Sequence, residues 1–508
     1  MKINPGGENR NIIPRWRPLA QAAHYGELSP ATMTRATDAP FAETPTIPNA
    51  QSEAKFAFTV NPGLHTAGDV LSEAVVLGDR DEVVGRAIAL VNDGAQATDS
   101  LRTLAAYLKT PDASPPVPEA WDRVIAVKRA LARMYPRNAI AWVELALAHV
   151  NRGQLDASAK ELRIALALAP LNRYVVRSSA RFAALVGDVS DVRSHIRHHK
   201  ELLDDPWILS AELALAEVAE RTSPHMSRGR KVLRNSRFNA WHLSELASAV
   251  GTSEFRAGSD RRAKDFLTDA LSNPTENALA QVEWARNSGL KLGSTEGALV
   301  NRQRSYEANA MLLASIGNFA EAFDHGVKWQ ADQPFAPEPA AFLSWIGSIA
   351  LDDYAASVDA ARKGLVASPH DEMLKNNLIF GLANLGRLEE AQVALDQLRP
   401  DADHKIELAT VTATRGLVAF KHGLISEGRL NYRSAVQQFD AEKRSDSATV
   451  AHLLWAREEL LLRTAESVMV AREALARGDY GEDPLVVRWR RRIIDTTISA
   501  GLEAVLRP

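Results

Sequence analysis

Cysteine is absent from this chain of 508 residues, which excludes disulfides, thiolate zinc sites and cysteine nucleophiles. No apolar run is long enough to span a membrane, and the opening MKINPGGENR lacks the apolar core of a signal peptide. We therefore expect a cytoplasmic protein without a membrane partner. Strong charge of either sign is also lacking, because 60 basic and 63 acidic residues give a formal net charge of -3. The whole molecule thus offers no general attraction for nucleic acid.

Recognisable catalytic motifs are missing as well. The sequence contains no glycine-rich phosphate loop, no GxSxG elbow and no paired dinucleotide glycines. Carboxylate pairs such as Asp204 with Asp205 fall at expected turns, where helix capping explains them. His195, His198 and His199 place two imidazoles one helical turn apart, but a solvated helix face explains them better than a metal site does. We predict that the protein is not an enzyme and has no cofactor or metal.

The N-terminal residues are rich in proline, with four prolines between residues 30 and 48. Such a composition buries too little apolar surface to offset the entropy of ordering, so residues 1–54 are predicted to form a flexible tail. The stretch NIIPRWRPLA, residues 11–20, is the exception, because its apolar side chains can dock on the body of the protein or on a partner. FAFTV, residues 56–60, is predicted to form a short strand.

A small helical unit with a proline-rich linker is expected over residues 55–120. Apolar residues between 69 and 108 recur at helical spacing and predict two or three packed helices. The stretch TPDASPPVPEA, residues 110–120, holds four prolines and marks the best domain boundary. A helix from Trp121 to Met134 is expected to lead into the next region.

A repeat begins at AIAWVELALAHVNRGQLDASAKELRIALALAP, residues 139–170. Its spaced large, small and turn residues are Trp142, Leu145, Ala146, Gly153, Ala165 and Pro170. This pattern resembles the tetratricopeptide-repeat (TPR) family, whose unit is two antiparallel helices in 34 residues. Three further signature places hold types that depart from the commonest ones, namely His149, Ser158 and Leu162.

The same register continues along the chain. Gly187 lies 34 residues after Gly153, and later turn positions follow one another at intervals of about 34 to 37 residues: Gly317, Asp352, Gly386 and Gly423. A turn residue at the end of a first helix favours the left-handed conformation, in which glycine is least strained. The spacing therefore predicts an array of helical hairpins.

The resemblance implies an all-α fold, a right-handed superhelical solenoid of TPR-like hairpins of bacterial type. Its predicted parts are a first TPR-like block at 121–202, irregular hairpins at 203–301, a second TPR-like block at 302–440 and capping helices at 441–508. In the irregular part, insertions near Thr222 and Thr252 are expected to lengthen the turns inside two hairpins.

In the TPR family, the first helix of each repeat lines a concave groove. The resemblance predicts partner-binding residues at the matching positions: Tyr174, Arg177, Arg181, Arg304, Phe342, Ile346, Asn376, Phe380, Asn384 and Lys421. Apolar anchors beside Arg and Asn suit a peptide or helix. The favoured function is a non-catalytic scaffold that binds a protein partner's segment. The sequence leaves the oligomeric state open.

RNA binding is the alternative function. Arg15, Trp16 and Arg17 at one end, and Arg488, Arg490 and Arg491 around Trp489 at the other, combine cations for phosphate with indoles for base stacking. Burial of Trp489 with solvated arginines is the favoured interpretation. The start NIIPRWRPLAQAAHYGELS also resembles bacterial repeat proteins of conflict or defence systems, which implies a sensor or scaffold working with a separate effector. Nucleic acid is therefore possible but not favoured as a partner.

Overall fold

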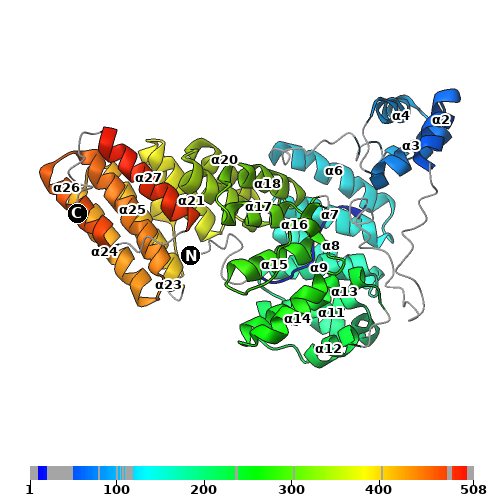
Figure 1. Ribbon diagram of the computed structural model, residues 1–508. Coiled ribbons are helices and arrows are strands. Elements are labelled where there is room, and N and C mark those ends of the chain that lie inside the picture. The colour runs from blue at the N-terminus through cyan, green and yellow to red at the C-terminus, as the bar shows by residue number, and fades with distance from the viewer. Residues whose placement is uncertain are drawn as a thin grey trace.

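A computed structural model describes residues 10–19, 50–77, 81–98, 101–102, 105, 108, 118–234, 238–300, 304–401, 404–477 and 483–499. The regular elements of these residues are all helices, which confirms the all-α prediction (Figure 1). Of the predicted tail, residues 1–9 and 20–49 lie outside the described residues, and the prediction is wrong for residues 50–54, which begin a helix. So does most of the predicted linker at 110–120.

Three of the described helices near the N-terminus share a core and form a small unit, set apart from the array in Figure 1. They are α2 (Ala50–Val60), α3 (Leu64–Leu77) and α4 (Glu82–Asp93). The predicted strand at residues 56–60 is wrong, because these residues end α2. Ala54 and Phe58, one helical turn apart, pack into the core while Phe56 is exposed. Burial thus follows the period of a helix and not the alternation of a strand.

The array begins with α6 (Pro118–Met134), which packs on the first repeat through Ile125 and Ala132. Ten first helices follow: α7 (Ala139–Asn151), α9 (Arg173–Val186), α11 (Pro206–Val218), α13 (Ala240–Arg256), α15 (Glu276–Asn287), α17 (Tyr306–Ser315), α19 (Pro337–Trp345), α21 (Glu372–Asn384), α23 (Lys405–Lys421) and α25 (Ser445–Leu462). Their partners are α8 (Leu155–Leu168), α10 (Ser190–His198), α12 (Met226–Arg234), α14 (Asp260–Ala270), α16 (Glu296–Val300), α18 (Phe319–Asp332), α20 (Tyr354–Ala367), α22 (Leu388–Gln397), α24 (Ile425–Ala441) and α26 (Ala465–Arg477). Two short helices, η1 (Lys200–Asp204) and η2 (Ile346–Leu351), complete the described array.

Left-handed residues mark the end of each first helix. They are Gly153, Gly187, Glu220, Gly258, Gly289, Gly317, Asp352, Gly386, Gly423 and Arg463. All six turn positions predicted from the spacing are among them. The register also continues through residues 203–301, where the intervals deviate from 34 residues and hide it. The inner turn near Thr252 is not lengthened as expected, because α13 runs unbroken past that residue to Arg256.

The array returns on itself, so that the first hairpin meets the seventh. The turn after α7 packs on the end of α20 so closely that a Cβ atom on Gly153 would lie 2.4 Å from the Val366 carbonyl oxygen. Phe335 and Ala367 share a core cluster with Val143 of α7. One turn of the superhelix is thereby closed around a central channel.

The last described helix, α27 (Pro484–Ser499), packs on α25 and reaches back to earlier hairpins. Its Trp489 Nε1 donates a hydrogen bond of 2.8 Å to the Ile349 carbonyl, and Arg492 donates to the carbonyls of Ile349 and Ala350. These donors satisfy acceptors at the end of η2, a π-helical continuation of α19. The predicted terminal cap is thus also a brace along the array.

Candidate functional site: a filled channel and an open groove

The central channel is filled by a segment of the chain itself, Arg10–Leu19, drawn dark blue among α7, α9 and α15 in Figure 1. The prediction of a flexible tail is wrong for this segment. The expectation that NIIPRWRPLA docks on the body of the protein is confirmed. The segment has no regular structure from Arg10 to Pro18 and lies among side chains of α7, α9, α13, α15, α17 and α18.

Arg17 occupies the most enclosed position of the segment. Its side chain is 0% exposed. Its Nε and Nη2 donate to both carboxylate oxygens of Asp332 at 2.9 and 2.8 Å, and its Nη1 donates to Glu276 Oε1 at 2.6 Å. This forked geometry suits guanidinium and is poorly reproduced by an ammonium group.

Trp16 fills an aromatic slot next to that ion pair. Its ring packs edge-on against Phe335, with centroids 5.7 Å apart, and against Phe182 at 6.5 Å. The side chain is 1% exposed. Burial of a whole indole in such a slot supplies much of the apolar energy of docking.

The other two arginines converge on Glu307. Arg10 donates through Nε at 2.7 Å and Nη2 at 3.0 Å, and Arg15 donates to the same carboxylate. Burial by itself raises the pKa of Glu307, but the two guanidinium charges and their hydrogen bonds outweigh it and lower the pKa to about 2. The carboxylate is therefore ionised at neutral pH.

Channel side chains also bind the main chain of the segment. Gln281 donates to the Arg10 carbonyl at 3.0 Å, Asn277 to the Ile13 carbonyl at 2.9 Å and Tyr174 to the Arg17 carbonyl at 2.9 Å, while Glu144 accepts from the Leu19 amide at 2.6 Å. Such contacts read an extended backbone whatever side chains it carries. The channel thus has the two components of a peptide-binding site, main-chain clamps and side-chain pockets.

The predicted groove residues of α9 all lie at this channel, but in different roles. Tyr174 contacts the segment directly. Arg177 pairs with Glu245 at 2.9 Å under the Trp207 ring and is buried between hairpins. Arg181 pairs with Glu338 at 3.3 Å across the closure of the superhelix.

Burial raises the pKa of Asp332, but Arg17 outweighs it, with smaller contributions from Arg15 and from Arg304, which precedes α17. The prediction missed Glu276, Asn277 and Asp332. Asn277 is the second residue of α15, as Tyr174 is of α9, so the register of the irregular part would have found it.

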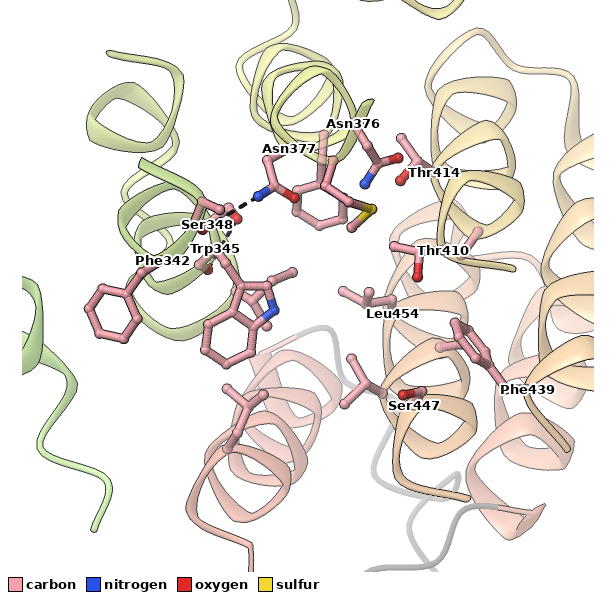
Figure 2. Close-up of a pocket in the computed structure, with 18 of the residues that line it drawn as sticks. Phe342, Trp345, Ser348, Asn376, Asn377, Thr410, Thr414, Phe439, Ser447 and Leu454 are labelled. Atoms are coloured by element: carbon pink, nitrogen blue, oxygen red, sulfur yellow. Dashed lines mark hydrogen bonds between the residues drawn. The ribbon is translucent and has the colours of Figure 1, made fainter. Parts of the chain in front are cut away.

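An open groove continues the concave face in the C-terminal half. It has a volume of about 470 Å³ and is lined by α19, η2, α21, α23, α24, α25 and the start of α27 (Figure 2). The aromatic residues of its lining are Phe342, Trp345, Phe380, Tyr432 and Phe439. The predicted groove residues Phe342, Asn376 and Phe380 lie together here. This surface is concave and mainly apolar, as binding sites commonly are.

Two asparagines supply the directional polar groups of the open groove (Figure 2). Asn377 Nδ2 donates to Ser344 Oγ at 2.9 Å, which fixes its side chain. Asn376 is 3% exposed, and its Oδ1 has no hydrogen-bond partner among the described residues. An unpaired buried acceptor costs free energy that a donor on a ligand can recover.

One end of the open groove is acidic. Glu338 and Asp371 line it, and within the described residues the lining contains no basic side chain. Arg181, which lies outside this lining, pairs with Glu338 and offsets part of the charge. Burial, with added repulsion from Glu338, raises the pKa of Asp371. Burial and the charge of Asp371 likewise raise the pKa of the nearby Glu407. A cation placed at this end would relieve that repulsion.

Three other predicted groove residues hold the array together and do not line the open groove. Ile346 is fully buried in the core. Asn384 accepts a hydrogen bond from Arg457, and Lys421 pairs with Glu458 at 2.9 Å, so both bind α25. Some residues that the family pattern places on the concave face therefore pack between repeats.

The residues proposed for RNA contact lie in two different environments. Arg15, Trp16 and Arg17 are held in the acidic channel, which removes them from a nucleic-acid surface in this conformation. On α27, Trp489 is 1% exposed, as favoured from the sequence, while Arg488, Arg490 and Arg491 are exposed.

The histidines of HIRHHKE lie around the end of α10. His195 Nε2 is 2.8 Å from the Pro170 carbonyl, and His199 is 4.0 Å from Glu201. Among the described residues, no group of three or more His, Asp or Glu is arranged to hold a metal ion. In the same part of the chain, no helix has the length and apolarity needed to cross a membrane.

Comparisons with known proteins assign no family or function to this chain. No protein-family model and no curated protein matches the sequence. Similar solved structures include the human IFIT1 dimer with PPP-AAAA, at 13% identity over 75% of this chain and 95% of that one, with a TM-score of 0.37. Yeast Tom70 is similar at 12% identity over 90% of this chain and 96% of its own, with a TM-score of 0.31. These TM-scores are low, and no functional conclusion follows from them.

Proposed function

We propose that this protein is a non-catalytic cytoplasmic scaffold that binds a segment or helix of a protein partner in the open groove. The partner would present apolar side chains to Trp345 and Phe380 and a basic residue to the acidic end at Glu338 and Asp371. Its own polar group would donate to Asn376. Aromatic contacts would supply most of the binding energy, and the polar contacts would set the register.

The unpaired Oδ1 of Asn376 in an open, aromatic-lined groove is the observation that carries this proposal. A buried amide of this kind is usually satisfied in a folded protein. In the N-terminal half, concave-face side chains such as Tyr174 and Asn277 are already bonded to Arg10–Leu19. The open groove is thus the part of the concave face with binding groups still available.

The test combines blocking of the groove with site-specific cross-linking. A photoreactive phenylalanine at Met373, which lines the groove, should form cross-links to a discrete partner in an extract of the source organism. Ala341→Trp and Ala413→Trp should each abolish those cross-links, because a bulky side chain occupies the space of the ligand.

Val393→Trp is the matched control, since Val393 is 59% exposed on α22 and does not line the groove. It should leave the cross-links unchanged. Equal cross-linking by wild type and both groove variants, with all three chains folded, would refute a site in this groove.

RNA binding at α27 is the second candidate, supported by its three exposed arginines. It is the weaker one, because the indole that would stack on a base is buried. Filter binding of single-stranded RNA over a salt series tests it, since phosphate contacts weaken steeply as salt rises. Retention at low salt that is lost in Arg488→Glu with Arg491→Glu would favour RNA over a protein partner.

A further inference from the structure

The contacts around Arg10–Leu19 differ from those of an ordinary repeat core. The segment brings Arg10, Arg15 and Arg17, and the channel meets it with Glu144, Glu276, Glu307 and Asp332. Ordinary contacts in a repeat array join neighbouring hairpins. The contacts of the channel instead join the short segment to residues more than 100 positions away in the sequence.

The contacts define the chemistry of a ligand. The carboxylate that binds Arg17 fits a guanidinium group, and the aromatic slot fits the indole of Trp16. Ile12 is buried among residues of α9 and α11. The main-chain clamps accept any extended backbone. The site therefore recognises an extended segment with an apolar residue followed by Arg-Trp-Arg.

The fit of the segment is incomplete in its middle. A cavity of about 180 Å³ lies beside it, lined by Ile13, Pro14 and Arg15 on one side and by Gln333 on the other. Arg15 Nε, Trp16 Nε1 and Gln333 Oε1 are buried without a hydrogen-bond partner in the described part of the chain. The segment and the channel are thus not fully complementary there.

We propose that the channel is a second peptide-binding site, which takes an extended partner segment of apolar and Arg-Trp-Arg chemistry, and that Arg10–Leu19 occupies it in cis. A ligand on the same chain competes at an effective concentration of order millimolar, so the cis segment keeps the channel closed to weaker ligands. Glu338 lines both the cavity beside the segment and the open groove. Release of the segment would thus extend the open groove into the channel.

The first experiment uses the full chain with Arg15→Ala and Arg17→Ala, which weakens the cis segment and leaves every channel residue intact. The probe is a fluorescent synthetic peptide with the sequence RNIIPRWRPL, and binding is followed by anisotropy. The variant should bind this peptide at least 100-fold more tightly than wild type does, because its channel is available. A peptide with norleucine in place of both arginines of RWR should bind the variant at least 100-fold more weakly.

A folded variant that fails to bind the peptide, or a wild-type chain that binds it equally well, would overturn the proposal. Hydrogen exchange of the wild-type chain is the second measurement and requires no variant to fold. Amides of Arg10–Leu19 should exchange at least tenfold faster than those of buried α11, since the segment detaches while the array stays folded. Exchange at the same rate as α11 would show a fixed structural brace.

Discussion

Arg17 and Asp332 form a forked ion pair across 315 positions of sequence, with both hydrogen bonds below 3.0 Å and the guanidinium completely buried. This pair fixes the N-terminal segment to the end of α18. Burial raises the pKa of the Asp332 carboxyl by itself, but the adjacent guanidinium of Arg17 holds it below its usual value. Both partners are therefore charged, and each depends on the other for its burial.

Loss of this pair should release the segment. Asp332→Ala leaves a buried guanidinium with less compensation, which costs about 3 kcal/mol. Hydrogen exchange of residues 10–19 should then accelerate roughly a hundredfold. The exposed ion pair of Arg362 and Glu390 provides the control, because Arg362→Ala should change the exchange rate of residues 10–19 by less than tenfold. Unchanged exchange of the segment in Asp332→Ala would contradict the role of the pair.

Acid should weaken the docking of the segment through Glu307. The pKa of Glu307 in the folded protein is about 2, below the ordinary value of 4.5, so its contribution to stability is complete above pH 4.5 and is lost as pH falls toward 2. The total is on the order of 3 kcal/mol. The midpoint of urea unfolding, measured between pH 7 and pH 2.5, should decrease as the pH is lowered below 4.5. Glu307→Gln should be less stable at pH 7 and should show a flatter fall, and an equal fall in both chains would argue against Glu307.

Closure of the superhelix can be tested with two glycines that share a backbone conformation. Gly153 and Gly386 have φ of 76° and 75°, but only the first would place a Cβ against a neighbour, the Val366 carbonyl. Gly386→Ala should cost about 1 kcal/mol from the left-handed conformation alone. Gly153→Ala should lower the free energy of unfolding by at least about 1 kcal/mol more than Gly386→Ala does, since α7 and α20 must separate. Calorimetric melting measures both losses. Equal losses would mean that the contact is readily displaced.

The brace formed by α27 depends on Trp489. Trp489→Ala removes a buried indole and its hydrogen bond to the Ile349 carbonyl, and should cost about 3 to 5 kcal/mol. Arg491→Ala, at an exposed position of the same helix, should stay within about 0.5 kcal/mol of wild type. Thermal unfolding of the two variants side by side provides the comparison, and similar melting temperatures would show that α27 does not stabilise the array.

Helical periodicity and turn spacing predicted the array well, because each hairpin packs mainly on its neighbours in sequence. Gly153 and Gly386 were found from their spacing alone, and both adopt the left-handed conformation. The pattern failed at Gly258 and Gly289, where intervals shorter or longer than 34 residues conceal the same turn. It also failed at Phe58, whose five-residue neighbourhood is too short to distinguish two periods.

The sequence by itself determined the helices, their pairing into hairpins and the concave face, since all three depend on residues close together along the chain. Only the tertiary structure decided that Arg15, Trp16 and Arg17 lie in an acidic channel and that Phe342, Asn376 and Phe380 line one open groove. The physical reason is that the partners of the segment, such as Glu276 and Asp332, lie hundreds of residues away. Their meeting depends on how the superhelix closes, and local periodicity carries no information about that closure.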